Sequence, residues 1–291
     1  MILVTGCTGY IGSRLCKQLL TNGYKVCGLI KPSEKNKADS LIELGLIPFY
    51  GELTEPKSLS NIAGGIEFVY HLAGIHSNYH NTYHLYVEGT KNLLEELKGR
   101  KKIPIVVASN SAVYAGMPVP HRESCYPVTM NPFGRITLEM EKEVMDFSEN
   151  YAVFRLGEVY GDNESNPFQA CSKGITLIGN GMNNTAKVHI QDVTNILERC
   201  IKFFPKGIFN LCDDLPVRQL EFYQYVETLS KKKCIQLKTE MELSERIMLS
   251  IHGLRTLNIE MDNSLIKQTL DYEFVFPTYK KGLTYLYKNQ C

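Results

Sequence analysis

Short apolar runs alternate with segments of helical periodicity along the first two thirds of the chain. Residues 1–5 form an apolar run that is typical of a buried parallel strand, and glycines break it. Apolar residues then recur at helical spacing from Ile11 to Leu20, and Asn22-Gly23 ends the pattern. Further strands are expected at 24–30, 47–50, 67–71, 103–108, 151–156 and 207–212, and further helices at 83–97, at 135–150 and after 192. Strands that alternate with helices in this way predict an α/β fold with a doubly wound parallel sheet.

The regular alternation ends near Gly161, and the rest of the chain is mixed in pattern. A loop-rich stretch runs through 178–181 before a further strand and helix begin near 188. We therefore expect residues 1–165, together with about 186–212, to form the larger domain. Residues from about 166 to 185 and from 213 to 291 are expected to form a smaller C-terminal region that binds a substrate or a partner.

The composition indicates a globular protein. Hydrophobic residues make up 44% of the 291 residues and charged residues 22%. Basic and acidic residues number 32 and 31, so the net charge is +1 and a nucleic-acid partner is not expected. No apolar run approaches the length of a membrane span, so we expect no membrane partner either.

The number and spacing of the cysteines indicate which cellular compartment the protein occupies. Nine cysteines are scattered along the chain without a CxxC pair. The first residues already form a predicted strand, which leaves no room for a signal peptide. These observations predict a cytoplasmic protein with reduced thiols and no disulfide framework.

A glycine-rich loop with the sequence TGCTGYIG joins the first strand to the first helix. Gly6 permits a tight turn, Gly9 lets the backbone approach a pyrophosphate, and Gly12 lets the helix pack closely on the strand. The helix N-terminus offers unpaired N–H groups and a positive dipole end to the phosphates. The pattern predicts a dinucleotide site on a Rossmann domain, in which the intervening loop residues Cys7, Thr8, Tyr10 and Ile11 also meet the cofactor.

The end of the second strand bears on the choice of dinucleotide. NAD sites place a carboxylate there to hold the ribose 2′-hydroxyl, about 20 residues beyond the loop. This chain has Ile30 and then Lys31, with Lys35 and Lys37 nearby. A missing carboxylate and a neighbouring ammonium favour NADP(H) over NAD(H). The alternative is that the lysines only solvate a loop.

Five further segments resemble short sequence patterns of a known protein family. They are GEL at 51–53, HLAG at 71–74, GTKNLL at 89–94, RLGEVYG at 155–161 and VHIQDV at 188–193. In order and spacing they resemble the extended short-chain dehydrogenase/reductase family, also called the NAD-dependent epimerase/dehydratase family. The resemblance runs along almost the whole chain and implies a homodimer formed through the helices at 83–97 and 135–150. It also places seven residues beside the cofactor, namely Glu52, Leu53, Leu72, Ala73, Gly74, Ser109 and Leu156.

The catalytic positions depart from the family. Family chemistry uses a tyrosine as general acid/base, a lysine four residues later and a serine or threonine that bonds the reacting oxygen. In this register Phe133, Thr137 and Asn110 occupy those three positions. Phenylalanine carries no exchangeable proton and threonine supplies no fixed charge. We therefore predict an NAD(P)(H)-binding protein that has lost the reaction of the family and acts as a sensor or regulatory partner of an unidentified small molecule or protein.

Two alternatives remain open at this stage. One is an active reductase, epimerase or dehydratase with a displaced acid, for which His76 and His80 are the candidates. These histidines and His84 recur at helical spacing, so they could instead present a metal-binding face or simply line a pocket. The other is a structural subunit with an empty cofactor loop. Nucleotide-sugar members often carry an arginine near the place of Thr185, where only Lys187 is close, so the sequence does not favour a nucleotide-sugar substrate.

Overall fold

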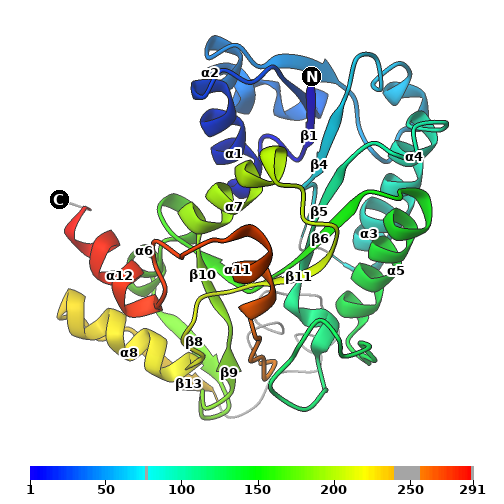
Figure 1. The fold of residues 1–291 in the computed structure, drawn as a ribbon. Helices are drawn as coiled ribbons and strands as arrows, with labels where there is room; N and C mark the ends of the chain where they lie inside the picture. Colours follow the sequence, from blue (N-terminus) through cyan, green and yellow to red (C-terminus); the bar gives the residue numbers. More distant parts are fainter. Residues whose placement is uncertain (76–77, 239–255, 290–291) are drawn as a thin grey trace.

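The computed structural model describes residues 1–75, 78–238 and 256–289, and its central element is a seven-stranded parallel sheet (Figure 1). The order of the strands is β11-β6-β5-β4-β1-β2-β3. Their bounds are β1 Ile2–Thr5, β2 Val26–Ile30, β3 Ile47–Tyr50, β4 Phe68–His71, β5 Ile105–Asn110, β6 Tyr151–Leu156 and β11 Gly207–Leu211. The strand order reverses between β1 and β4, which confirms the doubly wound sheet predicted from the sequence.

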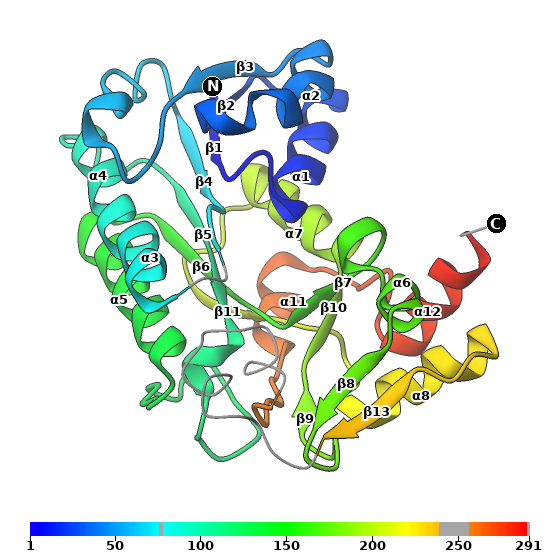
Figure 2. The same cartoon turned by 180° about the vertical axis from the view of Figure 1, so that it is seen from behind.

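Helices cover both faces of this sheet, because side chains of a buried parallel strand point alternately to the two faces (Figures 1 and 2). On β1, Ile2 and Val4 join one core while Leu3 joins the other. The first core includes residues of α1 (Tyr10–Thr21), α7 (Ile190–Lys202) and α11 (Ser264–Leu270). The second is covered by the helical segment 79–96 and by α5 (Pro132–Phe147).

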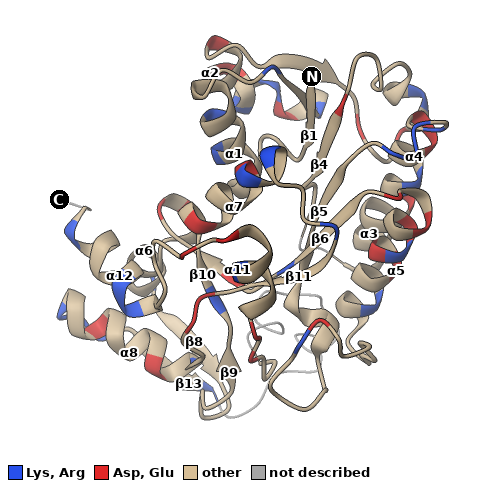
Figure 3. Cartoon of the chain, in the orientation of Figure 1, with Lys and Arg blue, Asp and Glu red and all other residues tan. Residues whose placement is uncertain are grey.

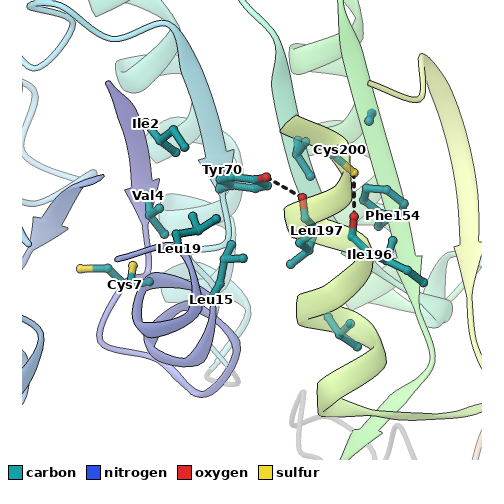
Figure 4. Close-up of a cluster of buried hydrophobic side chains, with 14 of the residues drawn as sticks. Ile2, Val4, Cys7, Leu15, Leu19, Tyr70, Phe154, Ile196, Leu197 and Cys200 are labelled. Atoms are coloured by element: carbon teal, nitrogen blue, oxygen red, sulfur yellow. Dashed lines mark hydrogen bonds between the residues drawn. The ribbon is translucent and has the colours of Figure 1, made fainter. Parts of the chain in front are cut away.

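Figure 4 shows how α7 is fixed to the first face. The Tyr70 hydroxyl, on β4, donates a hydrogen bond of 2.5 Å to the carbonyl oxygen of Leu197. The Cys200 thiol donates to the Ile196 carbonyl one turn away. Burial raises the pKa of Tyr70 well above its ordinary value, so this hydroxyl remains a donor.

Two predicted helices differ from the observed ones at their N-terminal ends. The helix expected at 83–97 begins earlier and consists of α3 (Tyr79–Tyr83), a π-helical turn η3 (His84–Glu88) and α4 (Gly89–Glu96). The α5 helix begins three residues before the predicted start. Asn131 caps it by accepting a hydrogen bond from the Gly134 N–H, and Pro132 occupies its first position.

Shorter elements form a second group, which we call the smaller lobe: α6 (Pro167–Ser172), β8 (Ile175–Ile178), α8 (Gln219–Ser230), β13 (Ile235–Lys238) and α12 (Tyr279–Lys288). They share a core that includes Phe222, Tyr223 and Leu283. Two small strand pairs lie between this lobe and the sheet, β7 (Glu158–Tyr160) with β10 (Lys187–His189) and β9 (Asn184–Thr185) with β12 (Val217–Arg218). Only Gly157 separates β6 of the large sheet from β7.

The remaining short helical turns lie in the connections between the longer elements. They are η1 (Pro32–Ala38), α2 (Asp39–Glu43), η2 (Pro56–Leu59), η4 (Ser111–Tyr114) and η5 (Asn163–Ser165). Lysines and acidic residues are interspersed on the outer helices (Figure 3). None of the helices within the described ranges is long and apolar enough to cross a membrane.

One expectation from the cysteines is wrong. Cys171 at the end of α6 and Cys234 just before β13 form a disulfide, with their Cα atoms 5.2 Å apart. Sequence spacing gave no sign of this pair because its members are 63 residues apart and meet only through the packing of the smaller lobe. The other cysteines in the described ranges are free.

Candidate functional site

A cavity of about 440 Å³ opens at the carboxyl ends of the central strands, where the strand order reverses. The large sheet and its loops contribute most of the wall, and the strand pairs and α8 contribute the rest. Ten of the residues predicted to meet a cofactor line it: Gly6, Gly9, Tyr10, Ile11, Gly12, Leu72, Ala73, Gly74, Ser109 and Leu156.

The glycine loop has the geometry that the sequence predicts. Gly6 has a φ of +69°, and a Cβ there would lie 2.8 Å from backbone atoms of Ala73. A Cβ on Gly12 would lie 2.1 Å from the carbonyl oxygen of Gly6. The tight turn and the close helix packing therefore require glycine at these two positions.

A buried chain of side chains joins β1 to β4 beneath the loop. The Thr5 hydroxyl lies 2.8 Å from Nδ1 of His71 and accepts a hydrogen bond from the Ala73 N–H. Nε2 of His71 lies 2.8 Å from the hydroxyl of Thr90. Burial lowers the pKa of His71 to about 4, so the ring is neutral near pH 7 and fixes the wall of the cavity without adding charge.

Five predicted cofactor residues are not among those that line the cavity: Cys7, Thr8, Lys31, Glu52 and Leu53. The thiol of Cys7 is buried and donates to the Leu29 carbonyl, and burial raises its pKa to about 12. Leu53 belongs to the core on the second face of the sheet. The Lys31 ammonium lies 3.1 Å from the Glu52 carboxylate.

A carboxylate that the sequence did not indicate lies beside the glycine loop. Glu34, on η1, accepts a 2.6 Å hydrogen bond from the Thr8 hydroxyl and a 2.8 Å bond from Lys37. These two hydrogen bonds hold the pKa of Glu34 below its usual value. The segment 31–37 was expected to be a lysine-rich loop; its 3₁₀ turn instead folds an acid back toward the loop.

The three family catalytic positions come together in the structure. Asn110 donates from Nδ2 to the Thr137 hydroxyl at 3.0 Å, and Thr137 donates to the Phe133 carbonyl at 2.9 Å. Asn110 also accepts a hydrogen bond from the Ala112 N–H. Phe133 is 1% exposed, and its ring meets that of Tyr86 edge to face at 5.5 Å. Asn110 and Thr137 thus bond to each other and to nearby backbone groups, and none of the three side chains is an ionisable acid or base.

Tyr86 is a cavity residue that the sequence did not reveal, because an aromatic at helical spacing is usually a core residue. It lies on the π-helical turn. Its hydroxyl packs so close to Gly74 that a Cβ on that glycine would lie only 2.6 Å from the hydroxyl oxygen. Burial raises its pKa to about 12, against an opposing hydrogen bond from the backbone of Ile75. Near pH 7 the cavity therefore contains a protonated phenol.

His80, one of the two predicted substitute acids, is not among the described residues that line the cavity. His80 is exposed on α3, and its ring stacks on His84 at 6.1 Å. His84 in turn bonds to Glu88. His76 lies outside the described residues. No group of three or more metal-binding side chains occurs in the part of the chain that the structure describes.

A buried ion pair supports the floor of the site. The Arg155 guanidinium donates to Glu141 at 2.7 Å and 3.1 Å and to the Tyr114 hydroxyl at 2.9 Å. Ser109 donates its hydroxyl to the same carboxylate. The Arg155 and Glu141 side chains are only 2% and 1% exposed, so removing either one would leave the other as a buried charge without its partner.

Comparison with known proteins identifies the family. The model of the NAD dependent epimerase/dehydratase family matches residues 2–212. The chain is 26% identical to an uncharacterized UDP-glucose epimerase of Bacillus subtilis, YtcB, over 66% of this chain and 69% of that protein. It is 24% identical to methionine adenosyltransferase 2 subunit beta of Xenopus laevis, over 75% of this chain and 63% of that protein.

Solved structures share the fold at low identity. A dTDP-glucose 4,6-dehydratase of Bacillus anthracis in complex with NAD aligns with a TM-score of 0.81 and 18% identity, over 99% of this chain and 95% of that one. A UDP-glucuronic acid 4-epimerase of Bacillus cereus in complex with UDP-glucuronic acid and NAD gives 0.78 and 22%, over 99% and 98%. With a family model that spans most of the chain, these matches show that the protein belongs to the NAD-dependent epimerase/dehydratase family.

Proposed function

We propose that this protein binds a nicotinamide dinucleotide, has lost the hydride chemistry of its family and acts as a sensor or regulatory partner. The observation that carries the proposal is that Asn110, Phe133 and Thr137, none of which is an acid or a base, meet at the three catalytic positions of the family. The family reaction needs a proton donor and a fixed ammonium at these positions, and the side chains present supply neither. Loss of a positioned acid/base costs roughly a hundred- to ten-thousand-fold in rate.

The loop region fits a dinucleotide. Gly9 caps α1 without a side-chain hydrogen bond, which leaves the first N–H groups of the helix to a pyrophosphate. A side chain at Gly6 or Gly12 would fill the turn. When bound, the nicotinamide would supply a hydride; the residues of this chain bind and orient it. Related structures that hold NAD support the same assignment.

The preference for NADP(H) expected from the sequence depends on Lys31. In the structure Lys31 lies beside Glu52, and Lys37 lies beside Glu34. A 2′-phosphate at the end of β2 would therefore meet two carboxylates as well as two ammonium groups, whereas a ribose hydroxyl could donate to Glu34. We propose that these pairs reduce the expected preference. Comparing the dissociation constants of NADPH and NADH for wild-type protein and Glu34→Gln tests this, because the variant should shift the ratio toward NADPH.

The partner role is supported by a relative whose name describes a subunit, methionine adenosyltransferase 2 subunit beta. The cytoplasmic location and the homodimer through the helices near α4 and α5 stay predictions. Light scattering after size-exclusion chromatography, with and without dinucleotide, checks the oligomeric state.

The test of the main proposal combines binding and turnover. Calorimetric titration should detect one dinucleotide per chain, and NAD(P)H incubated with carbonyl compounds should not be oxidised. Absence of dinucleotide binding would favour the structural-subunit alternative. Steady turnover that Phe133→Ala leaves unchanged would show that another group performs the chemistry and would overturn the proposal.

A second candidate function is an active enzyme with a displaced acid. The Tyr86 hydroxyl, protonated and in the cavity wall, is the observation that favours it. If purified protein turns over, Tyr86→Phe, His76→Ala and His80→Ala assign the acid: the variant that abolishes turnover identifies the donor, and unchanged rates in all three remove this candidate.

A further inference from the structure

An ion pair fixes the start of α1 to the connection that follows β7. The Arg14 guanidinium donates to one carboxylate oxygen of Asp162, from Nε at 3.0 Å and from Nη2 at 2.7 Å. Its remaining nitrogen, Nη1, donates to the Tyr10 carbonyl oxygen at 2.8 Å. Three hydrogen bonds therefore hold the guanidinium between two segments that are 148 positions apart in the sequence.

The same guanidinium holds the ring of Tyr10. Its central carbon lies 3.9 Å from the centre of that ring, in a cation–π contact. The Tyr10 hydroxyl donates to the Asp162 oxygen that Arg14 also bonds, at 3.5 Å. A Cβ on Gly161 would lie 2.5 Å from the hydroxyl oxygen, so the glycine leaves the space that this hydroxyl fills. The ring is thus fixed both at its face and at its hydroxyl.

Tyr10 lines the cofactor cavity, whereas the ion pair that holds it does not. Arg14 and Asp162 are absent from the described residues that line that cavity. They line a second cavity of about 580 Å³ between α1, α7 and α12. An effect of the pair on a ligand in the cofactor cavity therefore has to act through a neighbouring residue, and Tyr10 is a lining residue that both members contact.

The cofactor cavity extends from the glycine loop toward one side of the sheet. Its described lining includes residues at or just beyond the ends of β4, β5 and β6, and none from β2 or β3. A dinucleotide bound across the reversal of strand order places its adenosine ribose at the end of β2 and its other half on the opposite side. The Tyr10 hydroxyl reaches Asp162, which follows β6 and β7, so we expect its ring on the nicotinamide side.

We propose that Arg14 is a positioning residue for the dinucleotide, which together with Asp162 holds the Tyr10 ring in place for the nicotinamide half. The inference rests on the proposed function, because the ring has a ligand to meet only if a dinucleotide binds. A ring that is fixed before binding avoids the loss of side-chain freedom on binding, which for one side chain corresponds to about three- to tenfold in affinity. The adenosine half, which lies toward β2, gains nothing from this ring.

Calorimetric titrations of NADH, NADPH and ADP into wild-type protein and Arg14→Met test the inference. ADP carries the adenosine and two phosphates but lacks the nicotinamide half. We expect Arg14→Met to weaken binding of the tighter dinucleotide by about three- to tenfold and to leave ADP binding unchanged. The control, Lys17→Met, removes a positive charge from the next turn of α1 and should change neither affinity. Equal weakening of ADP and dinucleotide binding by Arg14→Met would show that its charge attracts phosphates, and overturns the inference.

A double variant tests whether Arg14 acts through Tyr10. Tyr10→Ala should lose at least as much dinucleotide affinity as Arg14→Met, and adding Arg14→Met to it should cause no further loss; a further loss of the same size overturns the inference. Asp162 is 57% exposed, so the pair adds little to stability and urea unfolding should give nearly equal midpoints for wild type and Arg14→Met. Unchanged dinucleotide binding by Arg14→Met rejects this inference alone, whereas absence of dinucleotide binding by the wild type rejects the proposed function as well.

Discussion

Asp213 predicts an unusual dependence of stability on pH near neutrality. This carboxyl is 3% exposed in the loop after β11 and accepts a hydrogen bond from the Leu215 N–H, while its Oδ2 has no hydrogen-bond partner among the described residues. Burial raises its pKa to about 8; the Leu215 N–H opposes the shift, neighbouring Asp214 adds to it and Lys187 reduces it. The folded protein therefore keeps a proton that the unfolded chain releases near pH 4.

The sign follows from proton binding. Between about pH 4 and pH 8 the folded state binds one more proton at this site than the unfolded state, so the free energy of unfolding falls as pH rises, by about 1.4 kcal/mol per unit. The contribution is complete below the unfolded pKa and is lost as pH rises through the folded one. Buried His71 and His189, each with a pKa lowered to about 4, act in the opposite direction, but only below about pH 6.5. The range from about pH 6.5 to pH 8 isolates Asp213 from these histidines.

Urea unfolding across that range measures the effect. Wild-type protein should lose stability with rising pH at about the stated slope, whereas Asp213→Asn should be more stable near pH 8 and should give a much shallower profile. The remaining slope near pH 8 comes from buried thiols such as Cys7, which stay protonated in the folded state while the unfolded chain begins to release their protons. Asp146→Asn, which removes an exposed carboxylate on α5, is the control and should keep the wild-type slope. Parallel profiles for wild type and Asp213→Asn would refute the assignment of a bound proton to this residue.

Three further predictions concern stability and the loop. Glu141→Gln should lower the free energy of unfolding by about 3–5 kcal/mol, because it leaves the buried Arg155 charge without its partner. The double variant Glu141→Leu, Arg155→Met removes both charges and should cost far less. Equal losses for the two variants in urea titrations would contradict this explanation. Cys234→Ser should cost about 4 kcal/mol for a closed loop of this length, and identical unfolding midpoints with and without reductant would show that the disulfide contributes nothing. Gly12→Ala should abolish dinucleotide binding in calorimetry, since its Cβ would lie 2.1 Å from a backbone oxygen, while Gly64→Ala should not.

The large sheet was predictable because its inner strands are buried on both faces. β6 has the bounds expected from the sequence, and β4 and β5 differ by one or two residues at their ends, since continuous apolar runs mark them. The helix expected at 83–97 exists but begins four residues earlier, and its π-helical turn was not predicted, because a π turn leaves no periodic signal in five residues.

The smaller lobe was much less predictable. β9 and β12 contain two residues each, too few for alternation to show. β8 pairs with β13, whose residues are about sixty positions away, so neither strand carries a local sign of its partner. The α8 helix buries Gln219 and Glu227 among apolar residues, which blurs the polar face that periodicity depends on.

In the candidate site, motifs predicted the loop and the three altered positions, because both depend on spacing along the chain. Glu34, Tyr86 and Glu158 were missed because each has a contact with a segment that lies elsewhere in the sequence. A hydrogen bond from the Thr8 hydroxyl holds Glu34 beside the glycine loop, and the Lys187 ammonium bonds to the Glu158 carboxylate. Contacts between distant segments leave no mark in a single sequence.

A single residue, Gly157, connects β6 of the large sheet to β7 of a small strand pair. The chain leaves the large sheet at Leu156 and enters the small sheet at Glu158, and these two residues and Gly157 all line the cavity. A Cβ on Gly157 would lie 2.7 Å from the Ala186 carbonyl oxygen, so this crossing is also tightly packed. The large sheet and the small strand pair are thus joined through one residue that has no room for a side chain, so Gly157→Ala would disturb both together.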